Sequence, residues 1–247
     1  MSPMNDHVSP ARPHHRFTDD GRRVREVLTY ARRGSRFTVK QQRAWDTYAE
    51  RFWISDEEVD KPGFSFAGCF DADQPLVVEI GSSIGEATAA LAAQRPAYNI
   101  LGFEVWRPGV AESVGRVGEL GLTNVRMCSV DAVWCVEHLL EEGQLAELWT
   151  FFPDPWHKKR HHKRRLVNAD FARIAATRLA PGAVWRLATD WGDYADQARE
   201  VLDAEPLLEG GPVPRWEDRP VTRFERRGVA EGREIVDLAY RRAPGPV

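Results

Sequence analysis

The stretch Leu76-Val-Val-Glu-Ile-Gly-Ser-Ser-Ile-Gly85 decides the fold class of this chain of 247 residues. Its first five residues form a short apolar run, rich in β-branched side chains, which is typical of a buried strand. The glycines then predict a turn, and the alanine-rich segment 86–94 predicts a helix that Arg95-Pro96 ends. A strand, a turn and a helix in this order form the first part of a βαβ unit.

The same alternation of strands and helices continues along the chain. We expect four further strands, at residues 99–105, 124–128, 148–152 and 183–189. Four further helices are expected, at residues 109–121, 133–140, 169–179 and 193–202. Residues 213–240 are expected to form a loop followed by closing strands. The predicted fold class is therefore α/β, Rossmann-like and doubly wound, with a mostly parallel sheet, helices on both faces and antiparallel closing strands at the C-terminus.

The composition and the start of the chain predict the domain organisation. Hydrophobic residues make up 43% of the chain, which is enough for a substantial core. Residues 1–20 are rich in Pro, His, Ser and Asp, and we expect a disordered leader there. Residues 21–70 are expected to be an N-terminal extension that packs on the main domain at 71–247. The helical spacing of Trp45, Tyr48 and Phe52 favours packing, and base stacking is the alternative role for these side chains.

The sequence has neither a membrane signal nor a disulfide pattern. It contains no continuous apolar run long enough to span a membrane, and no apolar signal-peptide region lies near the N-terminus. Cys69, Cys128 and Cys135 lack a CxxC spacing, so we interpret them as buried thiols in a reducing compartment. We therefore expect a soluble, cytoplasmic protein with no membrane contact.

Positive charge is concentrated in two segments of a chain whose formal net charge is only −3. Residues 157–165 carry a net charge of +6 and residues 12–43 carry +7, which leaves −16 on the rest of the chain. A protein that grips phosphates along one face has this kind of asymmetry. A solvated segment without a partner is the alternative for either one alone. The presence of two basic segments favours a polyanionic partner.

Each predicted strand leads to an acidic residue at its carboxyl end. These residues are Glu79, Glu104, Asp131, Asp154 and Asp190. Ligands of open α/β sheets bind beyond the carboxyl ends of the strands, so we expect these carboxylates to line one site. A carboxylate there can accept hydrogen bonds from ribose hydroxyls, from an amino group or from a cationic ligand.

The turn from Gly81 to Gly85 lets the backbone approach a cofactor, but it lacks the G-x-G-x-x-G spacing of a dinucleotide site. Glu104 lies 23 residues after Gly81, near the ~20 residues expected for an acid that binds ribose. A cofactor with ribose but no pyrophosphate, such as S-adenosyl-L-methionine, therefore fits better than NAD. Glu79 would suit the methionyl ammonium group, and a helix-capping or loop acid is its alternative role.

The turn at Pro153-Asp154-Pro155 holds a carboxylate stiffly, because proline restricts φ on both sides of it. Trp156 adds a flat surface that suits a base. An ordinary turn at the end of a strand is the alternative, since Pro and Asp are frequent turn residues. The basic cluster that follows favours the functional interpretation of Asp154.

The histidines of the basic segment do not predict a metal site. His157, His161 and His162 have a spacing close to i,i+4, which could suit a metal ion. The lysines and the arginine between them would repel a cation. We therefore expect no metal here.

Several motifs resemble those of one enzyme family. Phe151-Phe-Pro-Asp-Pro-Trp-His-Lys158, followed by Arg160-His-His-Lys-Arg-Arg165, resembles the signature of bacterial tRNA (guanine-N7)-methyltransferases. Four further stretches agree with that family: Glu79-Ile-Gly with Gly85, Gly102-Phe-Glu-Val-Trp-Arg-Pro-Gly-Val110, Ala188-Thr-Asp-Trp191 and Arg219-Pro-Val-Thr-Arg-Phe-Glu-Arg-Arg-Gly228. The similarity runs from about Arg22 to the C-terminus, and the Pro-Asp-Pro-Trp-His-Lys and Thr-Arg-Phe-Glu segments are specific to the family.

The resemblance implies a class I methyltransferase that moves the methyl group of S-adenosyl-L-methionine to N7 of guanosine 46 in the variable loop of tRNA, leaving S-adenosyl-L-homocysteine. Asp154 is the implied active-site residue. The implied cofactor contacts are Glu79, Gly81, Gly85, Glu104, Asp131 and Asp154. The implied substrate and tRNA contacts are Lys158, Arg160, Lys163, Arg164, Arg165, Asp190, Thr222, Arg223, Phe224 and Glu225.

Two residues depart from the family pattern. Ser83 stands where the family usually has a glycine, which implies a tighter or slightly shifted loop. Trp106 stands where a histidine is common. Neither change removes a carboxylate, so we expect activity to be retained.

The chemistry of the acceptor defines the role expected of Asp154. Guanine N7 carries an in-plane lone pair and no proton, so its attack on the methyl group needs no general base. We expect Asp154 to orient the reactants and to stabilise the positive charge that develops on guanine. We further expect Arg223 and Lys158 to hold phosphates, and Glu225 or Asp190 to accept hydrogen bonds from guanine.

Two other functions compete with this one. Pro-Asp-Pro-Trp resembles the Asp/Asn-Pro-Pro-Tyr/Trp turn with which amino-methyltransferases grip an exocyclic amine, but the second proline of that turn is absent here. A non-catalytic RNA-binding protein that kept the fold is the other alternative. A pure binder has no use for carboxylates beside an anionic ligand, so the set of strand-end acids argues against it.

Overall fold

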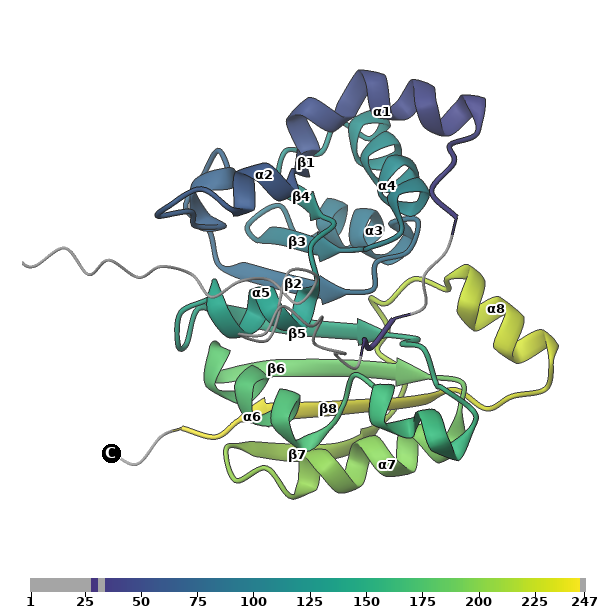
Figure 1. Cartoon of the computed structure of the whole chain (residues 1–247). Helices are drawn as coiled ribbons and strands as arrows, with labels where there is room; N and C mark the ends of the chain where they lie inside the picture. Colours follow the sequence, from purple (N-terminus) through teal and green to yellow (C-terminus); the bar gives the residue numbers. More distant parts are fainter. Residues whose placement is uncertain (1–27, 31–33, 245–247) are drawn as a thin grey trace, which may run out of the picture.

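Eight strands form one sheet in this computed structural model, which describes residues 28–30 and 34–244 (Figure 1). The order of the strands across the sheet is β1-β4-β3-β2-β5-β6-β8-β7. Their bounds are β1 Trp53–Ile54, β2 Leu76–Ile80, β3 Asn99–Phe103, β4 Val125–Cys128, β5 Leu145–Phe151, β6 Leu179–Thr189, β7 Leu208–Val213 and β8 Val236–Arg242. The leader expected over residues 1–20 lies outside the described residues.

The sheet is parallel except at one edge. β2 pairs in parallel with both β3 and β5, and the chain then builds outward on each side of it. β8 pairs antiparallel with β6 and with β7, which closes the sheet. The predicted α/β fold with a mostly parallel sheet and antiparallel closing strands is therefore confirmed. The strand order reverses between β2 and β5, and this reversal is the place where open α/β sheets bind ligands.

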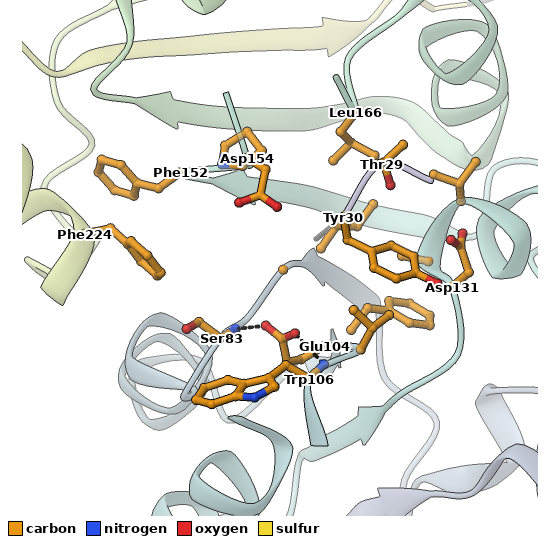
Figure 2. A pocket seen from close by; sticks show the side chains of 17 residues that line it. Thr29, Tyr30, Ser83, Glu104, Trp106, Asp131, Phe152, Asp154, Leu166 and Phe224 are labelled. Carbon is orange, nitrogen blue, oxygen red and sulfur yellow. Dashed lines mark hydrogen bonds between the residues drawn. The ribbon is translucent and has the colours of Figure 1, made fainter. Parts of the chain in front are cut away.

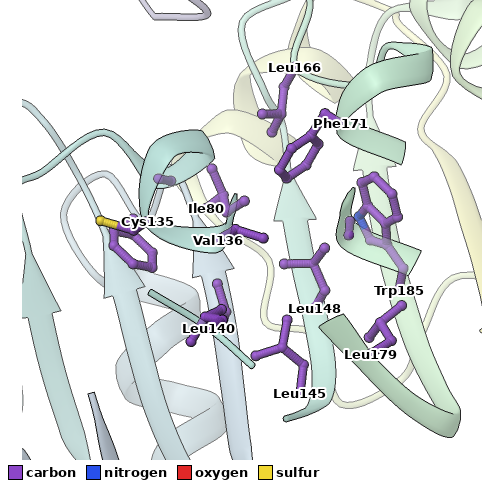
Figure 3. Packing of buried hydrophobic residues seen from close by; sticks show 14 of the residues in the cluster. Ile80, Cys135, Val136, Leu140, Leu145, Leu148, Leu166, Phe171, Leu179 and Trp185 are labelled. Carbon is purple, nitrogen blue, oxygen red and sulfur yellow. The ribbon is translucent and has the colours of Figure 1, made fainter. Parts of the chain in front are cut away.

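Helices cover both faces of the sheet. The longer helices are α1 Val39–Phe52, α3 Glu86–Gln94, α4 Arg107–Glu119, α5 Ala132–His138, α6 Ala169–Arg178, α7 Gly192–Asp203 and α8 Arg223–Ala230. Three short elements complete the described part: α2 Asp56–Val59, and the 3₁₀ turns η2 Ala67–Cys69 and η3 Lys159–Arg164. One apolar core contains side chains of α5, α6 and α7 (Figure 3), and the other contains side chains of α1, α3 and α4.

Strand β2 supplies both cores because its side chains alternate between the two faces. Leu76, Val78 and Ile80 belong to the core with α5, α6 and α7, whereas Val77 belongs to the core with α3 and α4. Glu79 has the same parity as Val77, so its side chain points toward α3. The alternation of β2 therefore determines the face of the sheet on which the Glu79 carboxyl lies.

Helix α1 lies against α4 at close range because α4 presents glycines to it. A Cβ at Gly118 would stand 2.2 Å from the ring of Tyr48, and one at Gly115 would stand 2.8 Å from Ala44. Trp45 and Tyr48 pack against the core under α4, and Phe52 is buried in it. These contacts agree with the packing role expected for the three aromatic side chains.

The closing part of the chain differs from the prediction. Residues 223–230 form helix α8 where a loop was expected, and strand β7 ends at Val213, where the closing segment was expected to begin. α8 carries four arginines or glutamates in its first five residues, so it lacks the apolar stripe by which a packed helix is recognised. β1 was also missed, because a strand of two residues has no periodicity.

Candidate active site

A pocket opens at the carboxyl ends of the central strands (Figure 2). It encloses about 880 Å³, including its open mouth. Four of the predicted cofactor residues line it: Gly81, Glu104, Asp131 and Asp154, which follow β2, β3, β4 and β5 in turn. The structure therefore brings these four residues together, as the spacing of the strands led us to expect.

Glu104 is oriented by the backbone on both sides of it. The Ser83 amide donates a hydrogen bond of 2.8 Å to one carboxylate oxygen, and the Trp106 amide donates one of 2.8 Å to the other (Figure 2). These two amide donors fix the direction of both carboxylate oxygens of Glu104. Such a carboxylate can accept hydrogen bonds from two vicinal hydroxyls of a ribose.

Asp131 stands at the start of α5 and is 6% exposed. One of its oxygens accepts a hydrogen bond of 3.1 Å from the Trp134 amide, which caps the helix. A capping carboxylate has a fixed direction, and this one lines the pocket. Asp131 can thus accept a hydrogen bond from a ligand amino group while it caps α5.

Asp154 lies in a turn whose backbone is strained on both sides. Phe152 has φ +53° and Trp156 has φ +48°, values that bulky residues rarely adopt. Three hydrogen bonds hold the turn: from the Phe152 amide to Ala188 O (2.7 Å), from Trp156 Nε1 to Thr29 O (3.0 Å) and from Arg165 Nε to Pro155 O (2.9 Å). A strained backbone that surrounding hydrogen bonds hold in place is typical of functional sites.

Glu79 lies beneath the glycine turn and does not line the main pocket. It is 3% exposed, and one carboxylate oxygen accepts a hydrogen bond of 2.5 Å from the hydroxyl of Thr88 on α3. Burial raises the pKa of Glu79 to about 7, the Thr88 hydroxyl opposes this rise, and the charge of Glu104 adds to it. The sequence indicates this direction of the Glu79 side chain, because residues 77 and 79 of a strand point to the same face and Val77 packs in the core with α3.

Gly85 also lies outside the main pocket. It precedes α3 with φ +72°, and a Cβ there would stand 2.8 Å from Ser113 Oγ. A glycine is needed at position 85 because of the left-handed backbone and because α4 approaches closely there.

Thr29 and Tyr30 line the pocket, although sequence analysis did not select them (Figure 2). Arg164 holds the backbone of this segment through hydrogen bonds of 2.8 Å to Leu28 O and to Tyr30 O. The Arg164 guanidinium also lies 3.5 Å from the centre of the Trp156 ring. The two bonds to Leu28 and Tyr30 join residues more than 130 positions apart, and no local pattern in the sequence predicts them.

The basic segment divides into outward and inward side chains. Lys158, Arg160 and Lys163 are exposed, whereas Arg165 is 1% exposed. Besides its bond to Pro155 O, Arg165 donates a hydrogen bond of 2.5 Å to Asp193. This bond from Arg165 lowers the pKa of Asp193. Arg164 and Arg165 therefore support the turn from within, and the exposed side chains, which include Lys159, face solvent.

The predicted substrate acids of the closing part are paired with arginines. Asp190 accepts a charged hydrogen bond of 2.7 Å from Arg233. Glu225 is 5% exposed and is bonded by Arg215 (2.7 Å) and Arg219 (2.6 Å). Neither acid lines the main pocket.

The first turn of α8 lies against the glycine turn. Phe224 lines the main pocket, 6.5 Å from Phe152 between ring centres (Figure 2). Thr222 precedes the helix and is 6% exposed. The Arg223 side chain donates a hydrogen bond of 2.7 Å to the hydroxyl of Ser83. Of the substrate residues predicted in this segment, Phe224 reaches the main pocket.

The described residues contain no group of three or more His, Cys, Asp or Glu side chains placed to hold a metal ion. Within the same described part, no helix is both long and apolar enough to cross a membrane.

Comparisons with known proteins agree on one family. Residues 73–238 match a family described as "Putative methyltransferase". The chain is 68% identical over 237 residues to a tRNA (guanine-N(7)-)-methyltransferase from a Nocardioides species, with 96% of each chain covered. It is 47% identical over 237 residues to the protein of the same name from Cutibacterium acnes, with 90% of this chain and 86% of that one covered.

Solved structures share the fold at low sequence identity. The 16S rRNA methyltransferase KamB matches with a TM-score of 0.53 and 17% identity, covering 77% of this chain and 95% of that one. A 16S rRNA (adenine(1408)-N(1))-methyltransferase from Catenulisporales acidiphilia, solved with its cosubstrate, matches with a TM-score of 0.51 and 16% identity, covering 70% and 88%. At these identities the likeness concerns the fold alone.

Proposed function

The chain belongs to the family of tRNA (guanine-N7)-methyltransferases, and we propose that it methylates guanosine 46 in the variable loop of tRNA. Its reaction is the transfer of a methyl group from S-adenosyl-L-methionine to N7 of a guanine in tRNA. The observation that carries the proposal is the pocket in which Glu104, Asp131 and Asp154 meet beside an exposed basic segment. A cytoplasmic location, where tRNA is processed, belongs to the same proposal.

The donor set of the pocket fits S-adenosyl-L-methionine. Three carboxylates suit a ligand with two ribose hydroxyls, an ammonium group and a positive sulfonium. Gly81, with φ +81° and no atom within 4 Å of a Cβ position, leaves room for a ligand beside the turn. When bound, this cofactor supplies an electrophilic methyl group on a positively charged sulfur.

Glu104 and Asp131 hold the cofactor in this proposal. Glu104 presents its charge to the ribose, because both of its oxygens are already oriented by neutral amides. Asp131 accepts a hydrogen bond from an amino group at the other end of the pocket. Glu79 supports the turn from below, since its carboxyl is turned toward Thr88. A direct contact between Glu79 and the ammonium group is therefore no part of the proposed mechanism.

Asp154 acts by orientation and by charge. Guanine N7 has no proton to lose, so Asp154 has no proton to remove from it. As the methyl group is transferred, positive charge moves to the guanine ring, and a fixed carboxylate beside the ring stabilises that charge. The strained, hydrogen-bonded turn keeps the carboxylate in place, so little reorganisation is needed during the reaction.

Guanine enters next to Phe224 in this proposal. Phe224 and Phe152 both line the pocket, and their rings are nearly parallel, at 20° to each other. Aromatic faces of this kind stack on bases. Asp190, Thr222 and Glu225 lie behind this surface, and we propose that they position α8 and the end of β6 for the base.

Exposed lysine and arginine side chains of the basic segment bind the tRNA backbone. Lys158, Arg160 and Lys163 are the exposed members of the predicted set. Arg164 and Arg165 fix the shape of the segment from inside, so replacing them would change its shape as well as its charge. Each phosphate contact that is lost should reduce the salt dependence of tRNA binding by about one unit of slope.

Transfer of labelled methyl from S-adenosyl-L-methionine to unmodified tRNA tests the function. We expect label on N7 of guanine in tRNA with guanosine at position 46, and a loss of label when that guanosine is replaced. If label is still transferred after the replacement, the protein methylates another guanine of the tRNA. Label on an exocyclic amine would identify an amino-methyltransferase instead.

The variant Asp154→Asn tests the role of the carboxylate in the same assay. It removes the charge and keeps the shape, so kcat should fall by a factor of about 100 or more, the loss typical of one oriented electrostatic contact. Affinity for tRNA should change little, because Asp154 is not part of the exposed basic surface. Wild-type turnover in this variant would remove Asp154 from the mechanism.

A further inference from the structure

Ser83 contacts two parts of the site that lie far apart in the sequence, Glu104 after β3 and Arg223 at the start of α8. Its amide donates a hydrogen bond of 2.8 Å to Glu104, the carboxylate proposed to hold the cofactor ribose. Its hydroxyl accepts a hydrogen bond of 2.7 Å from Arg223, at the start of α8. One residue thus contacts a cofactor carboxylate through its backbone and a closing-segment arginine through its side chain.

The backbone of Ser83 is strained, and close packing holds it there. Ser83 has φ +57°, which residues other than glycine rarely adopt, and it is 8% exposed. A Cβ at Gly109 would stand 2.4 Å from the Ser83 carbonyl oxygen, so α4 packs directly on this peptide. A glycine at position 83 would relieve the strain and keep the amide contact. What the serine adds is the hydroxyl that faces Arg223.

Further contacts fasten the first turn of α8 to the same loop. The Arg223 amide donates a hydrogen bond of 2.8 Å to Glu86, and the Arg226 side chain donates one of 2.8 Å to the other oxygen of that carboxylate. The Arg223 guanidinium also lies 4.9 Å from the centre of the Phe224 ring. Because Phe224 lines the pocket, a shift of Arg223 moves the surface on which the base stacks.

We propose that Ser83 is a positioning residue that couples the cofactor site to the tRNA site, by holding Glu104 with its amide and Arg223 with its hydroxyl. Cofactor bound to Glu104 fixes the turn at Ser83, and the turn then fixes Arg223 and Phe224 for the tRNA. Because binding couplings are reciprocal, bound tRNA also tightens the hold on the cofactor. This inference rests on the proposed function.

The measurement is the ratio of the tRNA Kd without S-adenosyl-L-homocysteine to the Kd with a saturating concentration of it. We expect the wild-type protein to bind tRNA several-fold more tightly with S-adenosyl-L-homocysteine present. Ser83→Gly keeps the amide and suits the positive φ, so it should fold well and bring the ratio close to one. Ser83→Ala, which lacks only the hydroxyl, should do the same. In steady state, both variants should raise the KM for tRNA more than they lower kcat.

Ser82→Ala is the matched control. Ser82 lies in the same turn and is also buried, but its hydroxyl faces the backbone of Phe103 at 3.4 Å. Removing that hydroxyl should leave the ratio as in the wild type. If Ser83 acts through Arg223, then Ser83→Gly should have no further effect on tRNA binding in an Arg223→Ala background.

The outcomes separate this inference from the proposed function. A wild-type protein that methylates tRNA but has a ratio of one overturns the coupling and leaves the function intact. So does a ratio that stays several-fold above one in both Ser83→Gly and Ser83→Ala. A wild-type protein that neither methylates nor binds tRNA overturns the function and, with it, the coupling.

Discussion

Acids of the first and second halves of the sheet are held by different kinds of partner. Glu104 and Asp131, which follow β3 and β4, accept hydrogen bonds from backbone amides. Three acids around β6, α8 and β8 are paired with arginine side chains, and these are Asp190, Glu225 and Asp237. An amide orients a carboxylate, whereas an arginine side chain also brings a positive charge to it. The oriented acids of the first half line the pocket, where we propose that they hold the cofactor, and the arginine-paired acids of the second half form a charged framework.

The largest expected effect comes from breaking that framework at Arg219. Its side chain has 0% exposure and bonds Glu225 at 2.6 Å and Asp237 at 2.9 Å. Arg219→Met leaves two buried carboxylates without their shared cation, which should lower the free energy of unfolding by about 3–5 kcal/mol. Urea unfolding measures the loss.

A matched arginine and a rescue sharpen this prediction. Arg227 lies on the exposed side of α8, with 73% of its side chain accessible, so Arg227→Met should leave stability nearly unchanged. Glu225 keeps its bond to Arg215, so adding Asp237→Asn to Arg219→Met removes the charge that has lost its arginine and should recover part of the loss. A loss below about 1 kcal/mol in Arg219→Met would show that the framework is not held by its charges.

Glu79 accepts its hydrogen bond from a threonine hydroxyl rather than from an arginine or an amide, and its replacement should have the next largest effect. Its pKa is about 7 in the folded protein and 4.5 for the free group. Between these values the folded state binds more protons than the unfolded state, so stability falls as the pH rises from 4.5 to 7 and is level above that. Glu79→Gln cannot ionise, and at pH 8 it should be more stable than the wild type by up to about 3 kcal/mol.

Urea unfolding at pH 5 and at pH 8 checks the sign of this effect. In Thr88→Val the carboxylate loses the hydroxyl that favours its charged form, so the pKa of Glu79 should rise further and the total loss of stability between pH 5 and pH 8 should become larger. A Glu79→Gln variant that is less stable than the wild type at pH 8 would mean that the buried carboxyl is charged and well solvated.

Glu104 provides the third test, which concerns binding rather than stability. A hydrogen bond to a charged group contributes about 1.5–3 kcal/mol, so Glu104→Gln should weaken binding of S-adenosyl-L-homocysteine by roughly 10- to 100-fold. Titration calorimetry measures the change. Glu112→Gln, in an acid of α4 outside the main pocket, is the control. Equal affinities in the wild type and in Glu104→Gln would contradict a role for this carboxylate in cofactor binding.

The local spacing of residues was enough to predict the acids at the strand ends of the first half. It was not enough to predict the arginines that pair with the acids of the second half. Glu104, Asp131 and Asp154 could be found because each follows a strand whose bounds are visible in the sequence. The pairing of Asp190 with Arg233 spans 43 residues and depends on how β8 returns to β6. No pattern within one element carries that information, so the arginine partners of these acids were not predicted.

The same limit applies to the basic segment and to the glycine turn. Arg164 was predicted to contact tRNA, but its bond to Leu28 O spans 136 residues. Glu79 was predicted to contact the cofactor; the alternation of β2 directs its carboxyl toward α3, where it lines a small second pocket with Gly81 and Ser83. Both contacts remain predictions. The inward bonds of Arg164 become visible in the tertiary structure alone, whereas the periodicity of β2 already indicates the direction of Glu79.

Glu86 lies in the first half of the chain but is bonded by the second, and its replacement should have the smallest effect on stability. It is the first residue of α3 in the first half, yet it is bonded by Arg223 and Arg226 of α8. Partial burial alone would raise the pKa of Glu86, but the hydrogen bonds from the Arg223 amide and from Arg226 outweigh it and lower the pKa. The stabilisation is therefore present at neutral pH and is lost as the pH falls through the lowered pKa.

Glu86→Gln should cost at most about 1 kcal/mol at pH 7, because Arg226 is 56% exposed and the pair is screened by solvent. Raising the salt concentration should shrink the difference between the variant and the wild type, and Arg226→Gln should reproduce it. A larger loss that is independent of salt would place Glu86 with Glu225 in the buried framework. The boundary between the two kinds of acid would then lie at the start of α3 rather than between β5 and β6.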